Sequence, residues 1–253
     1  MRELFFLLIT GLVQGLTEFL PVSSSAHLAL LEEIFTFPEN KRLSYTVFLH
    51  LGTLGALIIF FGKDLLLKIK RRDSPFFLKI ILASLLLFLV IPFRNWVATS
   101  FSQIKAISTF LLLTGILLFA TRFRQGTKEE ISYPAALLCG FFQLLSVFPG
   151  ISRSGATISI LLLLGIKEEC AYQFSFLLAI PAVTFANLYE LSKILGQKDF
   201  LFHPLILLGI FLSFLSGLFA LYLLKRVLIK RRFYLFSLYL FAFALFSLFV
   251  SRR

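Results

Sequence analysis

The amino-acid sequence predicts an all-α integral membrane protein with six transmembrane helices and two re-entrant helix pairs, arranged as an inverted-topology repeat. Hydrophobic residues make up 58% of the 253 residues and charged residues only 15%, which leaves too little polar surface for a soluble protein of this size. Several apolar runs approach the roughly 20 residues that a helix needs to cross a bilayer. Two further apolar regions are interrupted near their middle. We therefore expect one membrane domain, residues 1–253.

Six apolar segments are each predicted to form one membrane-spanning helix. They cover roughly residues 45–62, 75–92, 105–121, 172–190, 204–224 and 233–250.

The two interrupted regions, residues 4–36 and 134–166, predict helices that enter the membrane, unwind and return to the same side. Their central stretches read EFLPVSSSAH, residues 18–27, and VFPGISRSGAT, residues 147–157. Proline and serine break the helical pattern in both, and non-helical backbone survives at membrane depth only when protein or a wet cavity surrounds it.

Each interrupted region is followed by three predicted spans, so the chain divides into residues 1–121 and a second repeat, residues 134–250. Three is an odd number, and a re-entrant pair does not change sides. The second repeat must therefore start on the opposite membrane face, which makes the topology inverted. The two interrupted regions then enter from opposite faces and are predicted to meet near the midplane.

The formal net charge is +12, but the basic residues gather in short connections between apolar runs. They indicate topology and contact with membrane lipid head groups rather than nucleic acid binding. The side that holds connections 62–75, 122–133, 166–171 and 225–232 is the richer in Lys and Arg, so we expect it to be cytoplasmic and the first interrupted region to open outward. The two cysteines suggest neither a metal site nor a disulfide framework.

Four ionisable residues fall inside apolar segments, away from their ends: Glu18, His27, His50 and Arg153. Burying each costs several kcal/mol unless it is paired or hydrated, so an intramembrane charge is a functional candidate by default. The alternative is structural: Glu18 and Arg153 form one ion pair that locks the two repeats together. That alternative leaves the surrounding serines unexplained.

Arg153 stands between Ser152 and Ser154, just before a helical stretch that includes Thr157. Free backbone N–H groups at a helix start, three hydroxyls and a planar guanidinium all favour a bound phosphate or carboxylate. These residues therefore predict an anion site.

Ser23, Ser24 and Ser25 precede the second helical stretch of the first region and can cap it. His27 lies three residues beyond Ser24, a spacing that permits the imidazole to activate the hydroxyl as a nucleophile. The alternative for His27 is a packed, hydrogen-bonded side chain without a catalytic role.

Gln14 and Glu18 are four residues apart and so lie adjacent on one helix face. Glu18 could ligate a cation, orient His27 or take a proton. His50 and Gln143 are candidates for supporting polar groups near this site, and the alternative for each is a hydrogen bond to a neighbouring helix.

These motifs resemble the two signatures of the undecaprenyl-diphosphate phosphatase family of bacteria, the integral membrane type associated with bacitracin resistance. Residues 14–27 are similar to its first signature, residues 148–158 to its second, and residues 172–181 to a further recurrent stretch. The chain departs from the family pattern at Gln14, where Glu is common, and at His50, where Gln is common. The first departure removes one carboxylate.

The resemblance implies hydrolysis of a polyprenyl diphosphate to its monophosphate, which recycles the lipid carrier used in cell-wall synthesis. With the orientation given by the Lys and Arg count, we expect a multi-pass protein of the bacterial cytoplasmic membrane whose site opens to the outer face. It also implies a divalent cation, Mg²⁺ or Ca²⁺, for which Glu18 is the expected ligand. The expected partners are the polyprenyl diphosphate and membrane lipids, with a homodimer left open.

The expected catalytic residues are Glu18, Ser24, His27 and Arg153. The expected substrate-binding residues are Gln14, Ser23, Ser25, Ser152, Ser154 and Thr157. Ser24 assisted by His27 is the first choice of nucleophile, and water activated at Glu18 or His27 is the second. Two rival functions stay open: a secondary transporter or lipid flippase built on the same repeat, and a structural lipid-binding subunit.

Overall fold

The computed structural model describes residues 2–35, 39–101, 103–195 and 204–250. Within these ranges the protein is a bundle of helices, and the only β-structure is an isolated bridge between Lys128 and Ile166. The predicted all-α integral membrane fold is confirmed at this level, and the chain is a multi-pass membrane protein.

The described ranges contain five helices long and apolar enough to cross a membrane: Tyr45–Lys70, Ser74–Ser100, Ile104–Phe123, Glu168–Ile194 and Leu205–Ile229. They belong to α3 (Glu39–Lys70), α4 (Ser74–Leu85) with η1 (Leu86–Phe93) and α5 (Arg94–Ser100), α6 (Ile104–Ala120) with η2 (Thr121–Phe123), α9 (Glu168–Leu195) and α10 (Leu205–Ile229). The last predicted span, 233–250, is a shorter apolar helix, η3 (Phe233–Leu235) followed by α11 (Phe236–Val250).

Exposed apolar side chains mark the surface that would contact lipid. The helix Ser74–Ser100 is the clearest case, because only 11% of its most apolar window is buried inside the protein. Ile81 and Ile91 on this helix are more than half exposed. Exposure on this scale would be an aggregation hazard in water and suits a lipid environment.

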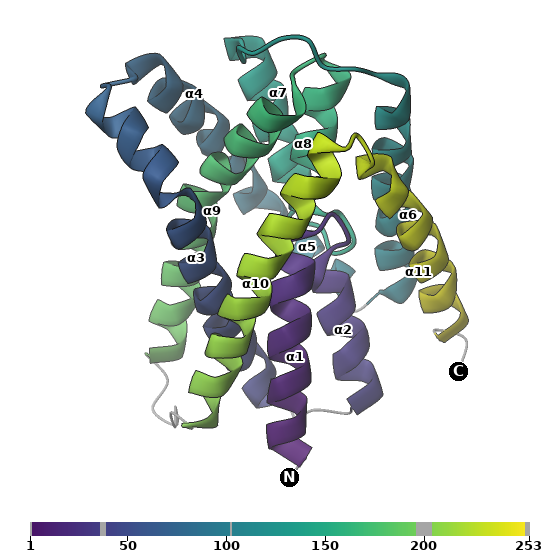
Figure 1. The fold of residues 1–253 in the computed structure, drawn as a ribbon. Helices are drawn as coiled ribbons and strands as arrows, with labels where there is room; N and C mark the ends of the chain where they lie inside the picture. The colour runs from purple at the N-terminus through teal and green to yellow at the C-terminus, as the bar shows by residue number, and fades with distance from the viewer. Residues whose placement is uncertain (1, 36–38, 102, 196–203, 251–253) are drawn as a thin grey trace.

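Two helical hairpins occupy the centre of the bundle. The first pairs α1 (Arg2–Phe19) with α2 (Ser24–Phe35), and the second pairs α7 (Tyr133–Leu145) with α8 (Arg153–Leu163). In Figure 1 the first hairpin rises from the end of the molecule that holds the N-terminus, and the second descends from the opposite end. Both interruptions predicted from the sequence are therefore helix breaks in the structure.

The loops at the hairpin tips are formed by residues that cannot continue a helix. Pro21 follows the end of α1, and Ser23 adopts a left-handed conformation with φ of 67°. Pro149 precedes Gly150, whose φ is 101°. Glycine adopts such a backbone without steric cost, whereas another residue there would be strained. Each tip thus reverses the chain within a few residues.

The two tips touch each other. The Gly150 backbone N–H donates a hydrogen bond to the Ser23 hydroxyl over 3.1 Å, and Gly150 also packs so closely that an added Cβ would lie 2.4 Å from the Ile107 carbonyl oxygen. The end of α1 and the starts of α2 and α8 are thereby brought together in the interior of the bundle (Figure 1).

Small residues allow α1 to lie against α10. A Cβ added to Gly15 would meet the Ser213 carbonyl oxygen at 2.4 Å and the Ser216 hydroxyl at 1.9 Å. Close approach of backbones through small residues is the usual way in which helices associate in membranes. Lipid tails are as apolar as the helix surface, so the hydrophobic effect does not drive helices together there. The contact fixes α1, which carries Gln14 and Glu18.

An aromatic cluster fills the core beside the hairpin tips. Phe176 of α9 is fully buried and packs edge to face on Phe19, with ring centroids 5.7 Å apart, and on Tyr172 at 4.9 Å. Phe61 of α3 stacks on the Phe176 ring, with centroids 5.5 Å apart. Tyr172 donates its hydroxyl to the Leu221 carbonyl over 2.8 Å. The cluster ties α3, α9 and α10 into one wall around the tips.

Candidate active site

Glu18, at the end of α1, collects four polar side chains around its carboxylate. Oε1 accepts a hydrogen bond from Arg153 Nη2 at 3.2 Å. Oε2 accepts from Ser24 Oγ at 2.8 Å and from Gln14 Nε2 at 3.1 Å, and His50 Nε2 lies 3.6 Å away. The carboxylate is therefore the centre of a cluster drawn from α1, α2, α3 and α8.

The Glu18–Arg153 pair is largely shielded, because the two side chains are only 10% and 13% exposed. Two charges in such a place stabilise each other, and removal of one partner leaves the other unpaired at a cost of about 3–5 kcal/mol. The pair joins residues 135 positions apart in the sequence. Each hairpin contributes one member.

Arg153 is the first residue of α8, so its backbone lies at the positive end of the helix. Ser152 caps this helix by accepting from the Gly155 N–H at 3.2 Å, and it shares a hydrogen bond with Ser154 at 3.3 Å. The guanidinium lies 5.6 Å from the centre of the Phe176 ring. The side chain is thus held by an ion pair on one side and an aromatic face on the other.

The two tips repeat one local pattern. Ser23 and Ser25 share a hydrogen bond at 3.2 Å, as Ser152 and Ser154 do at 3.3 Å. The residue between the two serines is Ser24 in the first tip and Arg153 in the second, and both contact Glu18. Corresponding positions in the two hairpins therefore bring a hydroxyl and a guanidinium to one carboxylate.

His27 and Ser24 share no hydrogen bond in the structure, although their spacing led us to expect a Ser24–His27 pair. Its Nδ1 lies 2.8 Å from the Ser23 carbonyl oxygen and its Nε2 lies 2.6 Å from the Tyr239 hydroxyl. Ser24 bonds to Glu18. Each side chain has another partner within reach. The imidazole bonds to the carbonyl four residues earlier, while the Ser24 side chain points to the end of α1.

Thr157 lies apart from the carboxylate cluster. Its hydroxyl donates to the Arg153 carbonyl at 2.7 Å and shares a hydrogen bond with Ser175 of α9 at 2.6 Å. Thr157 is fully buried. The contact fastens the first turn of α8 to α9, so Thr157 supports the position of Arg153.

Several buried polar atoms in the described residues have no hydrogen-bond partner, among them Arg153 Nη1, Gln14 Oε1 and both amide atoms of Gln143. Unpaired buried polar groups are rare, and each calls for an explanation. Arg153 Nη1 is a donor suited to a phosphate oxygen, and Gln14 Oε1 is an acceptor suited to a cation. Both belong to side chains that contact Glu18.

These side chains can bind a divalent cation only if the substrate supplies further oxygen atoms to the cation. The described residues hold no group of three or more His, Cys, Asp and Glu side chains that could bind a metal, and Glu18 is the single carboxylate of the cluster. Mg²⁺ commonly uses one or two carboxylates together with substrate phosphates and water. Glu18 and Gln14 Oε1 fit that kind of shared site and do not fit a cage built by protein alone.

A family model described as the bacitracin resistance protein BacA matches residues 7–246. The chain belongs to this family. The match includes both hairpin tips and every residue of the Glu18 cluster.

Curated relatives of this BacA family protein are similar over nearly their whole length. A protein of Thermosipho africanus named undecaprenyl-diphosphatase is 39% identical over 256 residues, covering 96% of this chain and 99% of the relative. A protein of the same name from Methanococcus maripaludis strain C5 is 39% identical, covering 95% and 98%. One from Carboxydothermus hydrogenoformans is 39% identical, covering 93% and 92%.

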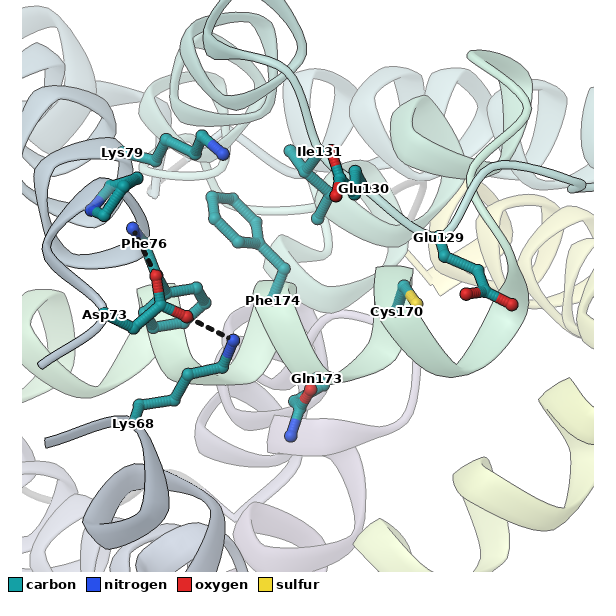
Figure 2. Close-up of a pocket in the computed structure, with 11 residues that line it drawn as sticks. Lys68, Asp73, Phe76, Lys79, Glu129, Glu130, Ile131, Cys170, Gln173 and Phe174 are labelled. Atoms are coloured by element: carbon teal, nitrogen blue, oxygen red, sulfur yellow. Dashed lines mark hydrogen bonds and ion pairs between the residues drawn. The ribbon is translucent and has the colours of Figure 1, made fainter. Parts of the chain in front are cut away.

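The BacA family protein also has a cavity of about 440 Å³ that none of the Glu18 cluster lines. It lies between the α3–α4 turn, the segment before α7 and the first turns of α9, and Figure 2 shows Lys79 and Phe174 on one side with Glu129 and Cys170 on the other. Both acidic and basic side chains line it, so it lacks the single sign of charge that an anionic substrate needs.

Asp73, at one edge of this cavity, has a structural role. The Lys68 ammonium lies 2.7 Å from its Oδ2 and lowers the pKa of the Asp73 carboxyl below its ordinary value. The other oxygen accepts from the Phe76 backbone N–H at 3.2 Å, which caps α4 (Figure 2). Asp73 therefore joins the end of α3 to the start of α4.

The sequence did not lead us to expect three residues that contact the predicted site residues: Ser175, Tyr239 and Phe243. Ser175 bonds Thr157, Tyr239 bonds His27, and Phe243 stacks on the His27 ring at 4.1 Å between centroids. Ser175 lies in the recurrent stretch 172–181, which was a usable signal. Tyr239 and Phe243 lie in a run rich in aromatic residues, which predicts contact with lipid. Their spacing does not distinguish them from the other aromatic residues of this run.

Proposed function

We propose that this protein hydrolyses undecaprenyl diphosphate to undecaprenyl phosphate and inorganic phosphate, and so recycles the lipid carrier of cell-wall synthesis. The observation that carries the proposal is the Glu18 cluster, in which a hydroxyl and a guanidinium meet one buried carboxylate. The name of the relatives supports the same reaction.

Arg153 binds the diphosphate in this proposal. Its Nη1 has no hydrogen-bond partner among the residues that the structure describes, and it donates to a phosphoryl oxygen while Nη2 stays on Glu18. The backbone N–H groups at the start of α8 add partial positive charge. Stabilisation of the charge that moves during phosphoryl transfer is then the main catalytic effect.

Ser24 is the proposed nucleophile, with Glu18 as its base. The Ser24 oxygen forms a bond to the terminal phosphorus, the bond from that phosphorus to the bridging oxygen breaks, and the polyprenyl monophosphate leaves. The Ser24 proton passes to Glu18 Oε2, which already accepts its hydrogen bond at 2.8 Å. Direct donation to a carboxylate replaces the Ser24–His27 pairing expected from the spacing.

His27 acts in the second half of the reaction. Water attacks the phosphoserine, the bond between Ser24 oxygen and phosphorus breaks, and Glu18 returns its proton to Ser24. Water keeps one hydrogen as the hydroxyl of hydrogen phosphate and gives the other to His27, which releases it to solvent. Direct attack on the diphosphate by water activated at Glu18 or His27 is the competing route.

A divalent cation, Mg²⁺ or Ca²⁺, belongs to the proposal as a partner of the diphosphate. When bound, it would supply positive charge that neutralises phosphate oxygens. Glu18 and the free Gln14 Oε1 are the residues that would hold it.

The proposed membrane arrangement has six spans and two re-entrant hairpins in an inverted repeat, residues 1–121 and 134–250. The hairpins that approach from opposite ends in Figure 1 support it, as does the repeated serine pattern of their tips. The distribution of Lys and Arg supports a cytoplasmic membrane location with the site open to the outer face. The polyprenyl tail lies among the exposed apolar helices.

The decisive experiment measures inorganic phosphate released from undecaprenyl diphosphate by purified protein in detergent with Mg²⁺. Wild type is expected to release phosphate, and Arg153→Ala and Glu18→Gln are expected to lose this activity. Folding of each variant is checked by gel filtration and circular dichroism. A folded wild-type protein that releases no phosphate overturns the proposal.

A second candidate function is transport or flipping of a lipid, favoured by the meeting of two hairpins through Ser23 and Gly150. Broken helices that meet at the midplane are the plan of many secondary transporters. Flux of a labelled polyprenyl phosphate across sealed liposomes without phosphate release would support this function in place of hydrolysis.

A further inference from the structure

Tyr239 of α11 contacts His27 of α2 across the bundle. The Tyr239 hydroxyl lies 2.6 Å from His27 Nε2, and 212 residues separate the two in the sequence. The Tyr239 ring is also nearly parallel to the imidazole, with centroids 5.7 Å apart and planes 6° apart.

The chemistry of the two His27 contacts fixes where its proton lies. The Ser23 carbonyl oxygen can only accept, so Nδ1, 2.8 Å away, must be the nitrogen that carries hydrogen. A neutral imidazole then has its lone pair on Nε2, and a phenol hydroxyl donates to that lone pair. In this Nδ1–H tautomer, Ser23 accepts from Nδ1 and Tyr239 donates to Nε2, so both contacts of the neutral ring are satisfied.

Packing restricts the orientation of the ring as well. Phe243, one helical turn beyond Tyr239, stacks on the imidazole with centroids 4.1 Å apart and planes 9° apart. The position of α11 is itself fixed against α6, where Ser108 and Ser247 share a hydrogen bond at 2.7 Å. His27 is therefore held by a helix that contributes nothing to the carboxylate cluster.

We propose that Tyr239 is a positioning residue for His27, which it keeps neutral, with Nε2 as the proton-accepting atom, beside the phosphate site. This proposal rests on the proposed function, in which His27 takes a proton from the attacking water. In the resting protein the Tyr239 hydroxyl occupies the Nε2 lone pair, so the attacking water must replace this hydroxyl before His27 takes the proton. The hydroxyl marks the direction from which the water approaches.

The test compares Tyr239→Phe, His27→Ala and the double variant in the phosphate-release assay. Tyr239→Phe keeps the ring and its stacking and removes only the hydroxyl. We expect kcat to fall about tenfold, the scale of one lost hydrogen bond at a proton-transfer site, with KM changed less than about twofold. In the His27→Ala background the same change is expected to alter kcat less than about twofold.

The matched control is Tyr222→Phe, which removes the hydroxyl of an exposed tyrosine on α10, and we expect it to keep wild-type kcat and KM. Multiplicative effects of Tyr239→Phe and His27→Ala would show that Tyr239 does not act through His27 and would overturn the proposal. So would a wild-type kcat in Tyr239→Phe.

A second measurement separates this proposal from the proposed function. The nitrogen resonances of ¹⁵N-histidine protein, assigned to His27 by their loss in His27→Ala, report the tautomer whether or not the protein releases phosphate. We expect a protonated Nδ1 and an unprotonated Nε2 in wild type, and a shifted Nε2 resonance in Tyr239→Phe. A protonated Nε2 in wild type would overturn the positioning role even if phosphate release is normal.

Discussion

The backbone N–H of Gly150 donates to the hydroxyl of Ser23 over 3.1 Å, and this bond joins the tips of the two hairpins. Both residues have a positive φ, 101° for Gly150 and 67° for Ser23. The close contact depends on the absence of a side chain at Gly150. Glu18, Ser24 and Arg153 lie within a few residues of this junction in the sequence, so the geometry that they form depends on the same contact.

Gly150→Ala is expected to destabilise the protein and to reduce activity. A Cβ would lie 2.4 Å from the Ile107 carbonyl oxygen and 2.9 Å from Phe110 Cβ, and alanine is strained at this φ. A cost of about 2–3 kcal/mol corresponds to a fall in Tm of roughly 4–12 °C for a chain of this length. Thermal unfolding in detergent measures the shift. Gly62→Ala is the control, because its Cβ would meet nothing within 4 Å, and its Tm should not fall.

Arg153→Lys is expected to lower kcat/KM about 10²–10³-fold while the protein stays folded. Lysine keeps the positive charge opposite Glu18 but lacks the planar fork that lets one side chain bond both Glu18 and a phosphate. Steady-state phosphate release measures the loss. Near wild-type activity in Arg153→Lys would mean that charge alone suffices and that the free Nη1 has no role.

Ser24→Ala tests the covalent route. Acid quenching of wild type during turnover, followed by mass spectrometry, is expected to find phosphate on Ser24, and Ser24→Ala is expected to lose activity by about 10³-fold or more. Ser192→Ala, which changes an exposed serine on α9, is the control and should retain activity. Full activity in Ser24→Ala would exclude Ser24 as nucleophile and favour attack by water.

Gln14→Glu is expected to strengthen the dependence on a divalent cation. The change places a second carboxylate about one hydrogen-bond length from Glu18, where Gln14 Nε2 now donates at 3.1 Å. Two adjacent carboxylates repel unless a cation lies between them. We expect the half-saturating Mg²⁺ concentration for phosphate release to fall about tenfold, and activity in excess chelator to fall below wild type. An unchanged Mg²⁺ dependence would remove Gln14 from the cation site.

Loss of the Asp73 side chain is expected to lower the stability of the protein. Asp73→Ala removes the cap of α4 and should cost about 1 kcal/mol, or roughly 2–4 °C in Tm at pH 7. Asp73→Asn keeps a capping oxygen and removes only the charge, a smaller loss because the pair with Lys68 is partly exposed.

The pH dependence of the Asp73→Asn effect follows from the direction of the pKa shift. The pKa of Asp73 is lowered by Lys68, so its charge adds stability above the unfolded-state value of about 3.9, and this stability disappears as pH falls through the lower folded-state value. The Tm difference between wild type and Asp73→Asn should therefore be present at pH 7 and vanish near pH 2. A difference that grows on acidification would contradict the assignment.

The apolar periodicity of the sequence predicted the helices well, because a chain in lipid must satisfy its backbone hydrogen bonds within helices. Both breaks were located from Pro21, Pro149 and the neighbouring serines. The adjacency of Gln14 and Glu18 followed from their four-residue spacing, since neighbours on one helix face are fixed by helix geometry.

The contacts of His27 could not be predicted from spacing. A separation of three residues places Ser24 and His27 on one face, but the rotamer of each side chain depends on partners elsewhere in the fold. Ser24 turns to Glu18 at the end of another helix, and His27 turns to Tyr239, 212 residues away. A local pattern contains no information about such distant partners.

The two hairpin tips have the same arrangement of serines but differ in the residue between them. Ser24 and Arg153 occupy the same place between paired serines, yet one offers a hydroxyl and the other a guanidinium. Two identical hairpins from separate copies of a shorter chain would present two hydroxyls or two guanidinium groups to each other. Joining both hairpins in one polypeptide lets each position mutate independently, so a structurally symmetric frame can hold a chemically asymmetric centre.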